Sequence, residues 1–327
     1  MLVDSFNRNH DYLRISLTDK CNLRCLYCMP HDLPEQFLQS RSWMNVDEME
    51  TIAKTFVDCG IKKIRLTGGE PLVRKEVREI ITRISSLPVE LALTTNAVLV
   101  DEYIDLFVEK GLRSVNVSLD SLDENTFRIL SQRDHFQKVV SNIKLLLSRG
   151  FHVKLNMVVM KGVNDLEIPA FVEMTRDANL HVRFIEFMPF KGNGWDQQQV
   201  FSSDEILNVI SKEFQYSKLD DRPHDTARNF YVDGFTGTFA IISTMTEPFC
   251  STCNRLRLTS DGKMKNCLFS NGEMDLLSAL RRGEDIVPLI KQSVLNKKFS
   301  RGGQMNGDLN SISAESIQNR SMIAIGG

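Results

Sequence analysis

The chain has 327 residues, of which 42% are hydrophobic and 25% are charged, and its formal net charge is −2. This balance is typical of a globular protein with a large core, and it argues against general attraction to nucleic acid or anionic membranes. Because no apolar run could span a bilayer and the polar start does not resemble a secretory signal, we expect a cytoplasmic protein without a membrane or nucleic-acid partner.

Between about residues 12 and 188 the sequence alternates short β-rich runs with helical patterns. Strands are predicted at 13–18, 63–67, 91–95, 114–118, 152–160 and 181–187, and helices at 46–58, 75–85, 102–109, in the stretch ending at Gly150, and at 169–178. Alternating strands and helices favour a parallel sheet. Six such units predict an α/β fold with an incomplete (β/α)6 TIM-like barrel, whose ligands would bind at the C-terminal ends of the strands.

After residue 195 the pattern changes to a helix around 204–214 and short extended runs such as 239–243. No internal repeat or low-complexity linker separates the two parts. We therefore expect a barrel core over residues 1–195 and a C-terminal region over residues 196–327 that packs onto it.

Three of the seven cysteines, Cys21, Cys25 and Cys28, form a C-x3-C-x2-C run after the first strand. In a reducing compartment, metal binding or catalysis explains such a group better than disulfides. Three thiolates on a [4Fe–4S] cube would leave one iron open, where the amino and carboxylate groups of S-adenosylmethionine could bind. A structural zinc site is the less favoured alternative, because zinc sites usually pair two C-x2-C units. Cys59 stands alone in an apolar helical stretch and is predicted to be a small buried hydrophobe.

The second group, Cys250, Cys253 and Cys267, again offers three ligands. Arg255 and Arg257 alternate as on an extended strand, so both should face one side. Guanidinium forks suit phosphate oxygens. This pattern fits a second cluster beside a substrate with a heterocycle nitrogen and a phosphate chain. Taken alone, it fits a zinc ribbon with solvent-facing arginines equally well.

Several motifs resemble those of known enzymes. The first cysteine run, with Tyr27 before its third cysteine, and the segment 68–71 resemble the two signatures of the radical S-adenosylmethionine superfamily, the second of which receives the methionine amino group. The chain as a whole resembles the GTP 3′,8-cyclase family of molybdenum cofactor biosynthesis, in the segments 13–21, 64–72, 93–96, 116–120, 161–165, 183–188, 249–253 and 325–327.

The resemblance implies a reaction and its partners. A radical drawn from S-adenosylmethionine would abstract the 3′ hydrogen of GTP, and the ribose carbon would attack C8 of guanine to give (8S)-3′,8-cyclo-7,8-dihydroguanosine 5′-triphosphate. The implied cofactors are two [4Fe–4S] clusters and S-adenosylmethionine. The implied partners are an electron donor such as a flavodoxin or ferredoxin and a downstream cyclic pyranopterin monophosphate synthase, and a homodimer is allowed.

The resemblance also assigns residues. The cluster ligands would be Cys21, Cys25, Cys28, Cys250, Cys253 and Cys267; the positions touching S-adenosylmethionine would be Tyr27, Gly69, Ser118 and Met188; those holding GTP would be Arg14, Arg65, Thr94, Lys154, Arg255, Leu256 and Arg257; and Arg255, Arg257, Gly326 and Gly327 would support catalysis.

Independent reasoning supports part of this assignment. Arg14, Arg65 and Lys154 lie in otherwise apolar strands, where an inward cation is costly unless it meets an anion. The resemblance places Arg183 at a basic position on the edge of the site, but a salt bridge with Glu186 or Asp177 fits this residue equally well. The stretch 31–45 departs from the family pattern, so its loop and partner contacts are left open.

Two other classes of protein remain as alternatives at this point. A peptide or sulfatase maturase is another radical enzyme with an auxiliary cluster, but such enzymes typically carry more C-terminal cysteines and lack the arginine pair. A zinc-dependent interaction module would contain neither iron nor sulfide.

Overall fold

The computed structural model describes residues 1–29, 42–221, 223–305 and 312–326. Its described strands form one sheet of twelve in the order β12-β11-β10-β1-β2-β3-β4-β5-β6-β9-β8-β7. The strands are β1 Tyr12–Ser16, β2 Lys63–Thr67, β3 Glu90–Thr95, β4 Ser114–Ser118, β5 His152–Val159, β6 Leu180–Glu186, β7 Tyr216–Lys218, β8 Arg228–Val232, β9 Thr238–Ile242, β10 Arg255–Leu258, β11 Lys263–Lys265 and β12 Met274–Asp275.

The first six strands are consecutive parallel neighbours, as predicted. Their bounds differ from the predicted ones by at most two residues. Parallel strands are covered on both faces and therefore carry many apolar residues. In β2, for example, Ile64 and Leu66 are fully buried. The α/β class of the fold is thus confirmed.

The helices are α1 Val46–Asp58, α2 Val77–Ile84, α3 Val100–Glu109, α4 Glu124–Ser131, α5 Phe136–Ser148, α6 Ile168–Glu173, α7 Ser203–Ser211, α8 Leu276–Arg281, α9 Val287–Leu295 and α10 Met322–Ile325. Helix α1 begins where predicted because Asn45 and Glu48 form a reciprocal capping box. The helical stretch expected to end at Gly150 is instead two helices, because Gln132 adopts a left-handed conformation and ends α4. None of the described helices is long and apolar enough to cross a membrane.

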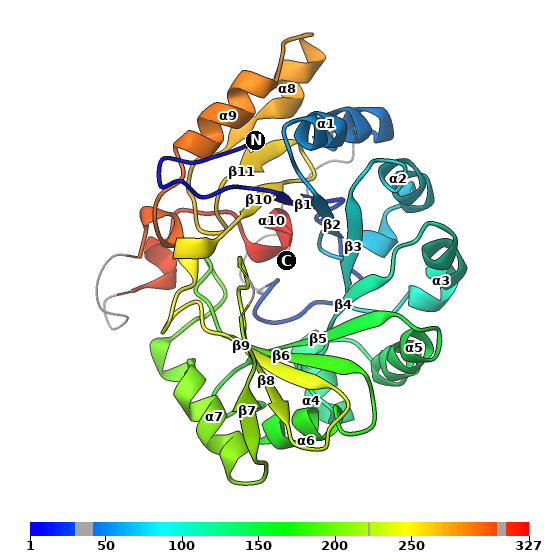
Figure 1. The fold of residues 1–327 in the computed structure, drawn as a ribbon, viewed down its shortest axis with the longest axis vertical. Coiled ribbons are helices and arrows are strands. Elements are labelled where there is room, and N and C mark those ends of the chain that lie inside the picture. Colours follow the sequence, from blue (N-terminus) through cyan, green and yellow to red (C-terminus); the bar gives the residue numbers. More distant parts are fainter. Residues whose placement is uncertain (30–41, 222, 306–311, 327) are drawn as a thin grey trace.

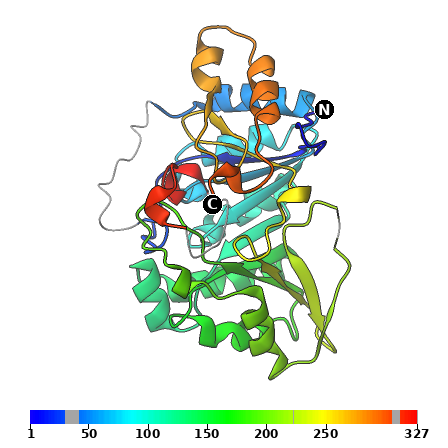
Figure 2. The same cartoon turned by 90° about the vertical axis from the view of Figure 1, so that its left-hand side faces the viewer.

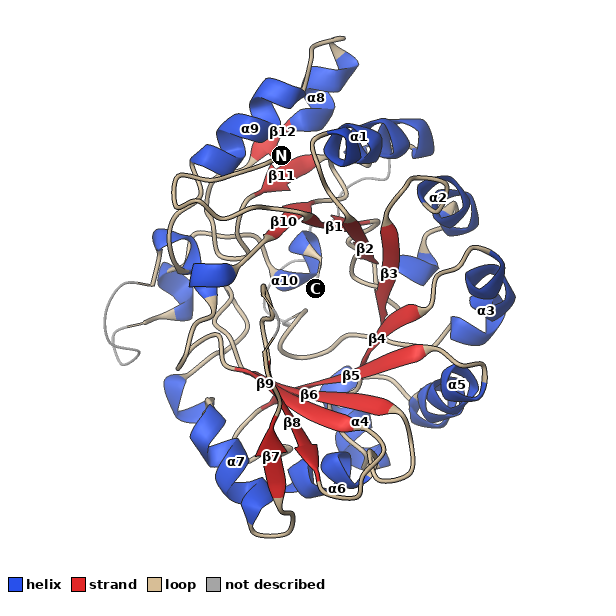
Figure 3. Ribbon diagram, viewed as in Figure 1, coloured by secondary structure: helices blue, strands red, loops and turns tan. Residues whose placement is uncertain are grey.

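The sheet curves into an arc, with α1, α2, α3 and α5 on its outer side (Figure 1). The short helix α10 lies inside the arc, close to the C-terminal end (Figure 3). Figure 2 shows the same end of the chain near the middle of the molecule. The C-terminal segment is therefore close to the inner side of the strands.

The region after residue 195 extends the sheet at both edges, which the sequence pattern did not predict. Strand β9 pairs in parallel with β6, and β10 pairs in parallel with β1. Arg257 is thereby placed opposite Arg14, which is in turn opposite Arg65 on β2. The division of the chain at residue 195 stays a prediction.

The main core lies between the sheet and the outer helices and includes Phe56, Phe107, Phe171, Phe184 and Phe239, all fully buried. Cys59 packs into this core with 9% of its surface exposed, as predicted for a small hydrophobe.

Candidate active site

The first cysteine group lines a cavity of about 180 Å³ at the C-terminal ends of the core strands. Cys21, Cys25 and Cys28 come from the loop after β1, Gly69 from the loop after β2, and Ser118 from the end of β4. Tyr27 and Met188 also line it. The structure thus brings together the three cysteines and the four residues predicted to touch S-adenosylmethionine.

Polar contacts fix the first cysteine loop. The side-chain nitrogen of Asn96, Nδ2, donates to Asn22 Oδ1 at 2.7 Å and lies 3.7 Å from Cys21 Sγ. The Tyr27 hydroxyl donates to Asp120 Oδ2 at 2.8 Å. Burial, together with nearby negative groups, raises the pKa of Cys21 and of Cys28 to about 12. A cationic centre between these thiols would favour their thiolate forms.

Glu70 is a buried carboxylate beside this loop. It accepts hydrogen bonds from Thr95 Oγ1 at 2.9 Å, from the backbone nitrogen of Asn96 at 2.7 Å and from the backbone nitrogen of Leu72 at 3.0 Å. Burial raises the pKa of Glu70 to about 7, although these bonds oppose the shift. A further hydrogen-bond donor arriving here would favour the ionised carboxylate.

Gly69 is required by a close backbone approach. A Cβ at this position would lie 2.4 Å from the Lys20 carbonyl oxygen and 3.1 Å from Ile323 Cγ1. Lys20 directly precedes Cys21, so the glycine allows the loop after β2 to lie against the start of the cysteine loop.

A second, larger cavity of about 390 Å³ holds the other cysteine group. Cys250, Cys253 and Cys267 all line it. Among the described residues, its cationic lining consists of Arg14, Lys63, Arg65, Lys154, Arg183, Arg255, Arg257 and Arg301, and its carboxylate lining is Asp225. This excess of positive charge suits a polyanionic ligand.

The crowding of cations in this cavity, together with burial, shifts the pKa values of its lining residues. Burial lowers the pKa of Arg14 to about 10 and that of Lys154 to about 8, and the neighbouring arginines contribute to both shifts. Burial raises the pKa of Tyr12, but the charges of Arg65 and Arg14 outweigh it and bring the pKa down to about 7. Every one of these cations would be stabilised by an anion entering the cavity.

Buried cations also surround the second cysteines. Lys297 Nζ lies 3.7 Å from Cys253 Sγ and donates to the Arg255 carbonyl at 3.0 Å. Burial raises the pKa of Cys253, but Arg255 and Lys297 more than offset it and lower the pKa to about 6. From the N-terminal segment, Arg8 Nη1 donates to the Cys250 carbonyl at 2.6 Å.

The two cavities adjoin. Among the residues that the structure describes, four line both cavities: Asn156, Ile185, Met188 and Met322. Asn156 is the polar member of this set, and its Oδ1 is buried without a partner among the described residues. Thr94 Oγ1 in the first cavity and Asn116 Oδ1 in the second share that property. Such atoms are usually satisfied in native structures, so they indicate ligand positions.

The predicted GTP residues separate into three placements. Arg14, Arg65, Lys154, Arg255 and Arg257 line the second cavity, and the two latter arginines lie on the same strand, as expected. Thr94 lies instead along the first cavity. The Leu256 side chain is fully buried in the apolar core, so only its backbone could meet a ligand.

The C-terminal glycines are described only in part. Gly326 lies beside Thr67 and Ser16, and its carbonyl accepts a hydrogen bond from Arg257 Nη1 at 2.5 Å. Gly327 is outside the described residues, as is most of the divergent stretch 31–45.

The sequence analysis did not predict His181 and Ile185 as lining residues, and it left Arg183 between the edge of the site and a salt bridge. On β6, His181, Arg183 and Ile185 line the second cavity at alternate positions. That two-residue period was a usable signal for Arg183. The alternative partner Glu186 accepts instead from the Met245 amide nitrogen at 2.7 Å and from the Thr246 hydroxyl.

The donor sets fit iron–sulfur clusters. Each cavity presents three thiols. The buried carboxylate of Glu70 lies beside the first cavity. Among the described residues, no three His, Cys, Asp or Glu side chains are grouped closely enough to hold a single metal ion. A cubane cluster takes each thiolate on a different iron, so its ligands are spaced more widely than those of one ion.

Two family models match the chain. The model of the radical SAM superfamily matches residues 15–175, and that of Molybdenum Cofactor Synthesis C matches residues 180–302. The chain is 43% identical to a mitochondrial GTP 3′,8-cyclase of Arabidopsis thaliana, over 100% of this chain and 84% of that protein. It is 40% identical to a GTP 3′,8-cyclase of Peptoclostridium acidaminophilum, over 91% and 92%.

A further relative is longer than this chain. Molybdenum cofactor biosynthesis protein 1 of Dictyostelium discoideum is 40% identical over all of this chain, which spans about half (52%) of that protein. Among solved structures, Streptococcus suis SuiB bound to S-adenosylmethionine matches with a TM-score of 0.57 at 14% identity, over 94% of this chain and 72% of that one. At that identity the likeness concerns the fold alone.

Proposed function

The chain belongs to the GTP 3′,8-cyclase family of the radical S-adenosylmethionine superfamily, and from this membership we propose that it converts GTP to (8S)-3′,8-cyclo-7,8-dihydroguanosine 5′-triphosphate in molybdenum cofactor biosynthesis. The observation that carries the proposal is the pair of adjoining cavities. One is lined by three cysteines and the buried carboxyl of Asp120, with Glu70 hydrogen-bonded to its lining residues Thr95 and Asn96, and the other combines three cysteines with a cluster of cations.

In the first cavity, Cys21, Cys25 and Cys28 would ligate a [4Fe–4S] cluster. When bound and reduced, that cluster with S-adenosylmethionine supplies a 5′-deoxyadenosyl radical. Glu70 would accept a hydrogen bond from the ligand's amino group, and Gly69 would lie beside the methionine chain at the wall of the cavity. Tyr27, Ser118 and Met188 would contact the remainder of the cofactor, with Tyr27 oriented by Asp120.

In the second cavity, Cys250, Cys253 and Cys267 would hold a second [4Fe–4S] cluster against the guanine. The cations of the lining would bind the triphosphate, with Arg255 and Arg257 reaching it from β10 and Arg14 and Arg65 from β1 and β2. These side chains orient GTP so that its ribose lies at the junction of the cavities. There the apolar Ile185, Met188 and Met322 exclude water from the reacting carbon.

Broader features of the proposal rest on the same membership. We propose an incomplete (β/α)6 barrel over residues 1–195, with the remaining residues supplying the second cluster site. The proposal includes electron donation by a flavodoxin or ferredoxin. It also includes a downstream cyclic pyranopterin monophosphate synthase and a homodimer. We keep the cytoplasm as the expected compartment, although one plant relative is named as mitochondrial.

The test is anaerobic turnover of the reconstituted protein with GTP, S-adenosylmethionine and a strong reductant, followed by mass spectrometry. A product isomeric with GTP, formed together with 5′-deoxyadenosine, is expected. Deoxyadenosine without altered GTP would preserve the radical enzyme and refute the substrate. Cys21→Ala should abolish deoxyadenosine formation, whereas replacing Arg255 and Arg257 with Ala should weaken GTP binding while both clusters stay loaded.

A further inference from the structure

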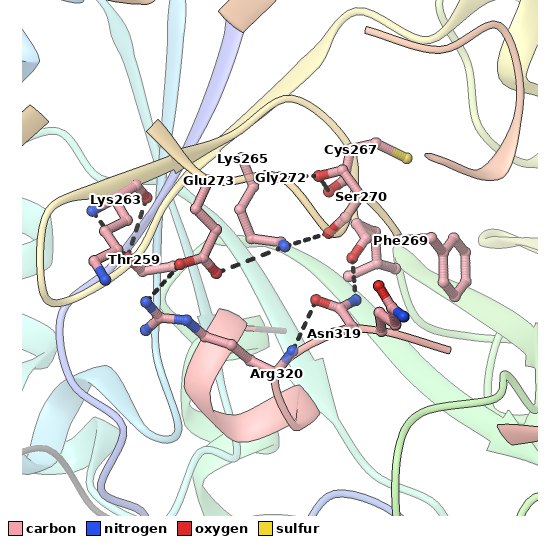
Figure 4. A network of polar contacts seen from close by, with 12 residues as sticks. Thr259, Lys263, Lys265, Cys267, Phe269, Ser270, Gly272, Glu273, Asn319 and Arg320 are labelled. Atoms are coloured by element: carbon pink, nitrogen blue, oxygen red, sulfur yellow. Dashed lines mark hydrogen bonds and ion pairs between the residues drawn. The ribbon is translucent and has the colours of Figure 1, made fainter. Parts of the chain in front are cut away.

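The turn 267–270, which carries Cys267, is fixed by one side chain of its own and by side chains from outside it (Figure 4). The first carbonyl of the turn, that of Cys267, accepts from Ser270 Oγ within the turn at 3.0 Å. The next three carbonyls accept from Asn319 Nδ2, Gln304 Nε2 and Lys265 Nζ. Asn319 belongs to the last described stretch of the chain, residues 312–326, which we call the C-terminal segment. That segment therefore takes part in fixing the position of this cysteine.

Arg320, the next residue, joins the C-terminal segment to the same region by three charge-assisted bonds. Its Nη1 and Nη2 donate to the two oxygens of Asp261 at 2.9 Å each, and Nη2 also donates to Glu273 Oε2 at 2.6 Å. The side chains of Asp261 and Glu273 are 11% and 18% exposed, and that of Arg320 is 21% exposed. Planar two-point pairing of this kind, largely withdrawn from water, fixes orientation as well as position.

We call the ion pairs of Arg320 with Asp261 and Glu273 the clasp, and Glu273 connects this clasp to Lys265. The other oxygen of Glu273, Oε1, lies 3.7 Å from Lys265 Nζ, and the Lys265 side chain is 1% exposed. Lys265 in turn donates to the Ser270 carbonyl, which closes the turn. A single carboxylate therefore connects the C-terminal segment with the buried lysine that shapes the Cys267 turn.

The chain reaches both cavities shortly after Arg320. Met322 lines both of them, and Ile323 approaches Gly69 beside the first cysteine loop. Gly326 accepts the hydrogen bond from Arg257 at the end of this segment. Arg320 is thus the last strongly anchored residue before the part of the chain that meets both cavities.

We propose that Arg320 is a positioning residue: by binding Asp261 and Glu273 it holds the C-terminal segment against the Cys267 turn and so sets the contact between Arg257 and Gly326. The clasp itself is independent of any substrate. Its effect on turnover rests on the proposed cyclase function.

The first measurement is hydrogen exchange of the anaerobically reconstituted protein without GTP, comparing the parent with Arg320→Gln. Loss of a charge-assisted pair should speed exchange of the amides in residues 318–326 by about ten-fold, with a smaller rise in residues 265–270. Arg176→Gln is the matched control, because Arg176 forms a similar fork with Glu173 on the exposed surface. It should leave both segments unchanged.

The second measurement is the ratio of cyclised product to 5′-deoxyadenosine, with iron content determined on the same samples. We expect Arg320→Gln to lower kcat for GTP by about ten-fold and to lower this ratio, because cofactor cleavage continues while GTP is misplaced. Arg320→Lys, which keeps the charge but loses the fork, should fall between Gln and the parent in both measurements.

The results separate the possible failures. Unchanged exchange in residues 318–326 of Arg320→Gln would overturn the clasp, whatever the activity. Faster exchange with an unchanged product ratio would overturn the positioning role and leave only a structural one. If Arg320→Gln does not retain iron, Arg320→Lys decides by the same two criteria. If the parent itself forms no cyclised product, the proposed function fails, and the exchange result still decides the clasp.

Discussion

The raised pKa of Glu70 predicts how affinity for S-adenosylmethionine depends on pH. The shift from 4.5 to about 7 corresponds to about 3 kcal/mol for ionising buried Glu70 before a ligand binds. The ionised carboxylate is the form that accepts a hydrogen bond from the bound amino group, so the contribution of Glu70 should raise the association constant about ten-fold per pH unit from pH 5.5 and level off above about pH 7. An amino group that coordinates iron releases its own proton, which adds a rise with pH common to the parent and its variants.

The assay is anaerobic calorimetry on cluster-loaded protein without reductant, at several values between pH 5.5 and 7. Glu70→Gln should bind more weakly than the parent at pH 7 and show a shallower rise of the association constant with pH. Glu186→Gln removes another buried glutamate whose pKa burial raises, and it should keep the slope of the parent. A slope in the parent that is no steeper than the slope of Glu70→Gln would refute the assignment of Glu70.

The same shift has a consequence for folding. Because folded Glu70 keeps its proton to a higher pH than the unfolded chain does, its contribution to stability is fully present below about pH 4.5 and is lost as the pH rises towards about 7. Bound ligand reverses that loss. The cofactor should therefore raise the melting temperature more at pH 7 than at pH 5.5.

Three other changes have definite expected outcomes. Gly69→Ala should lower both iron content and deoxyadenosine formation, because its Cβ would collide with the Lys20 carbonyl, whereas Gly272→Ala, whose Cβ meets nothing within 4 Å, should leave deoxyadenosine formation intact. Arg257→Lys should weaken GTP binding by about ten-fold in anaerobic calorimetry through loss of the planar fork, and equal affinity would place this arginine outside the site. Phe184→Ala should lower the free energy of unfolding by about 3–5 kcal/mol in denaturant titration, because the ring is fully buried, and a loss below about 1 kcal/mol would contradict its core role.

The core of the fold was predictable because its signals are local. Strands β2 and β4 and helix α1 have the predicted bounds, since alternation, β-branching and a capping box are all written within a few neighbouring residues. The pairing of β10 with β1 and of β9 with β6 depends on contacts between segments roughly 60 to 240 residues apart, for which a single sequence holds no local signal.

The candidate site shows the same division. Cysteine spacing and inward cations such as Arg14 indicated the two ligand sets, because their residue types are chemically unusual in those places. Asn156 and Met322 are ordinary residues whose importance arises only from lying between two cavities. The clasp at Arg320 could not be predicted from the sequence either. Its partners Asp261 and Glu273 are of residue types that usually lie on the surface, and here they are largely buried beside the C-terminal segment.

The arrangement of charge explains why the two cavities can share a wall without interfering. The buried carboxyl of Asp120 lines the first cavity and that of Glu70 lies behind its lining residues Thr95 and Asn96, whereas cations dominate the second cavity. Each cavity would therefore disfavour the other's proposed ligand, because a triphosphate would meet like charge in the first and a sulfonium cation would meet like charge in the second. The uncharged nucleoside portions of the two ligands would be the parts that meet at the apolar junction around Met188 and Met322. Charge separation between the cavities, rather than shape alone, would thus bring the two nucleosides together for hydrogen transfer.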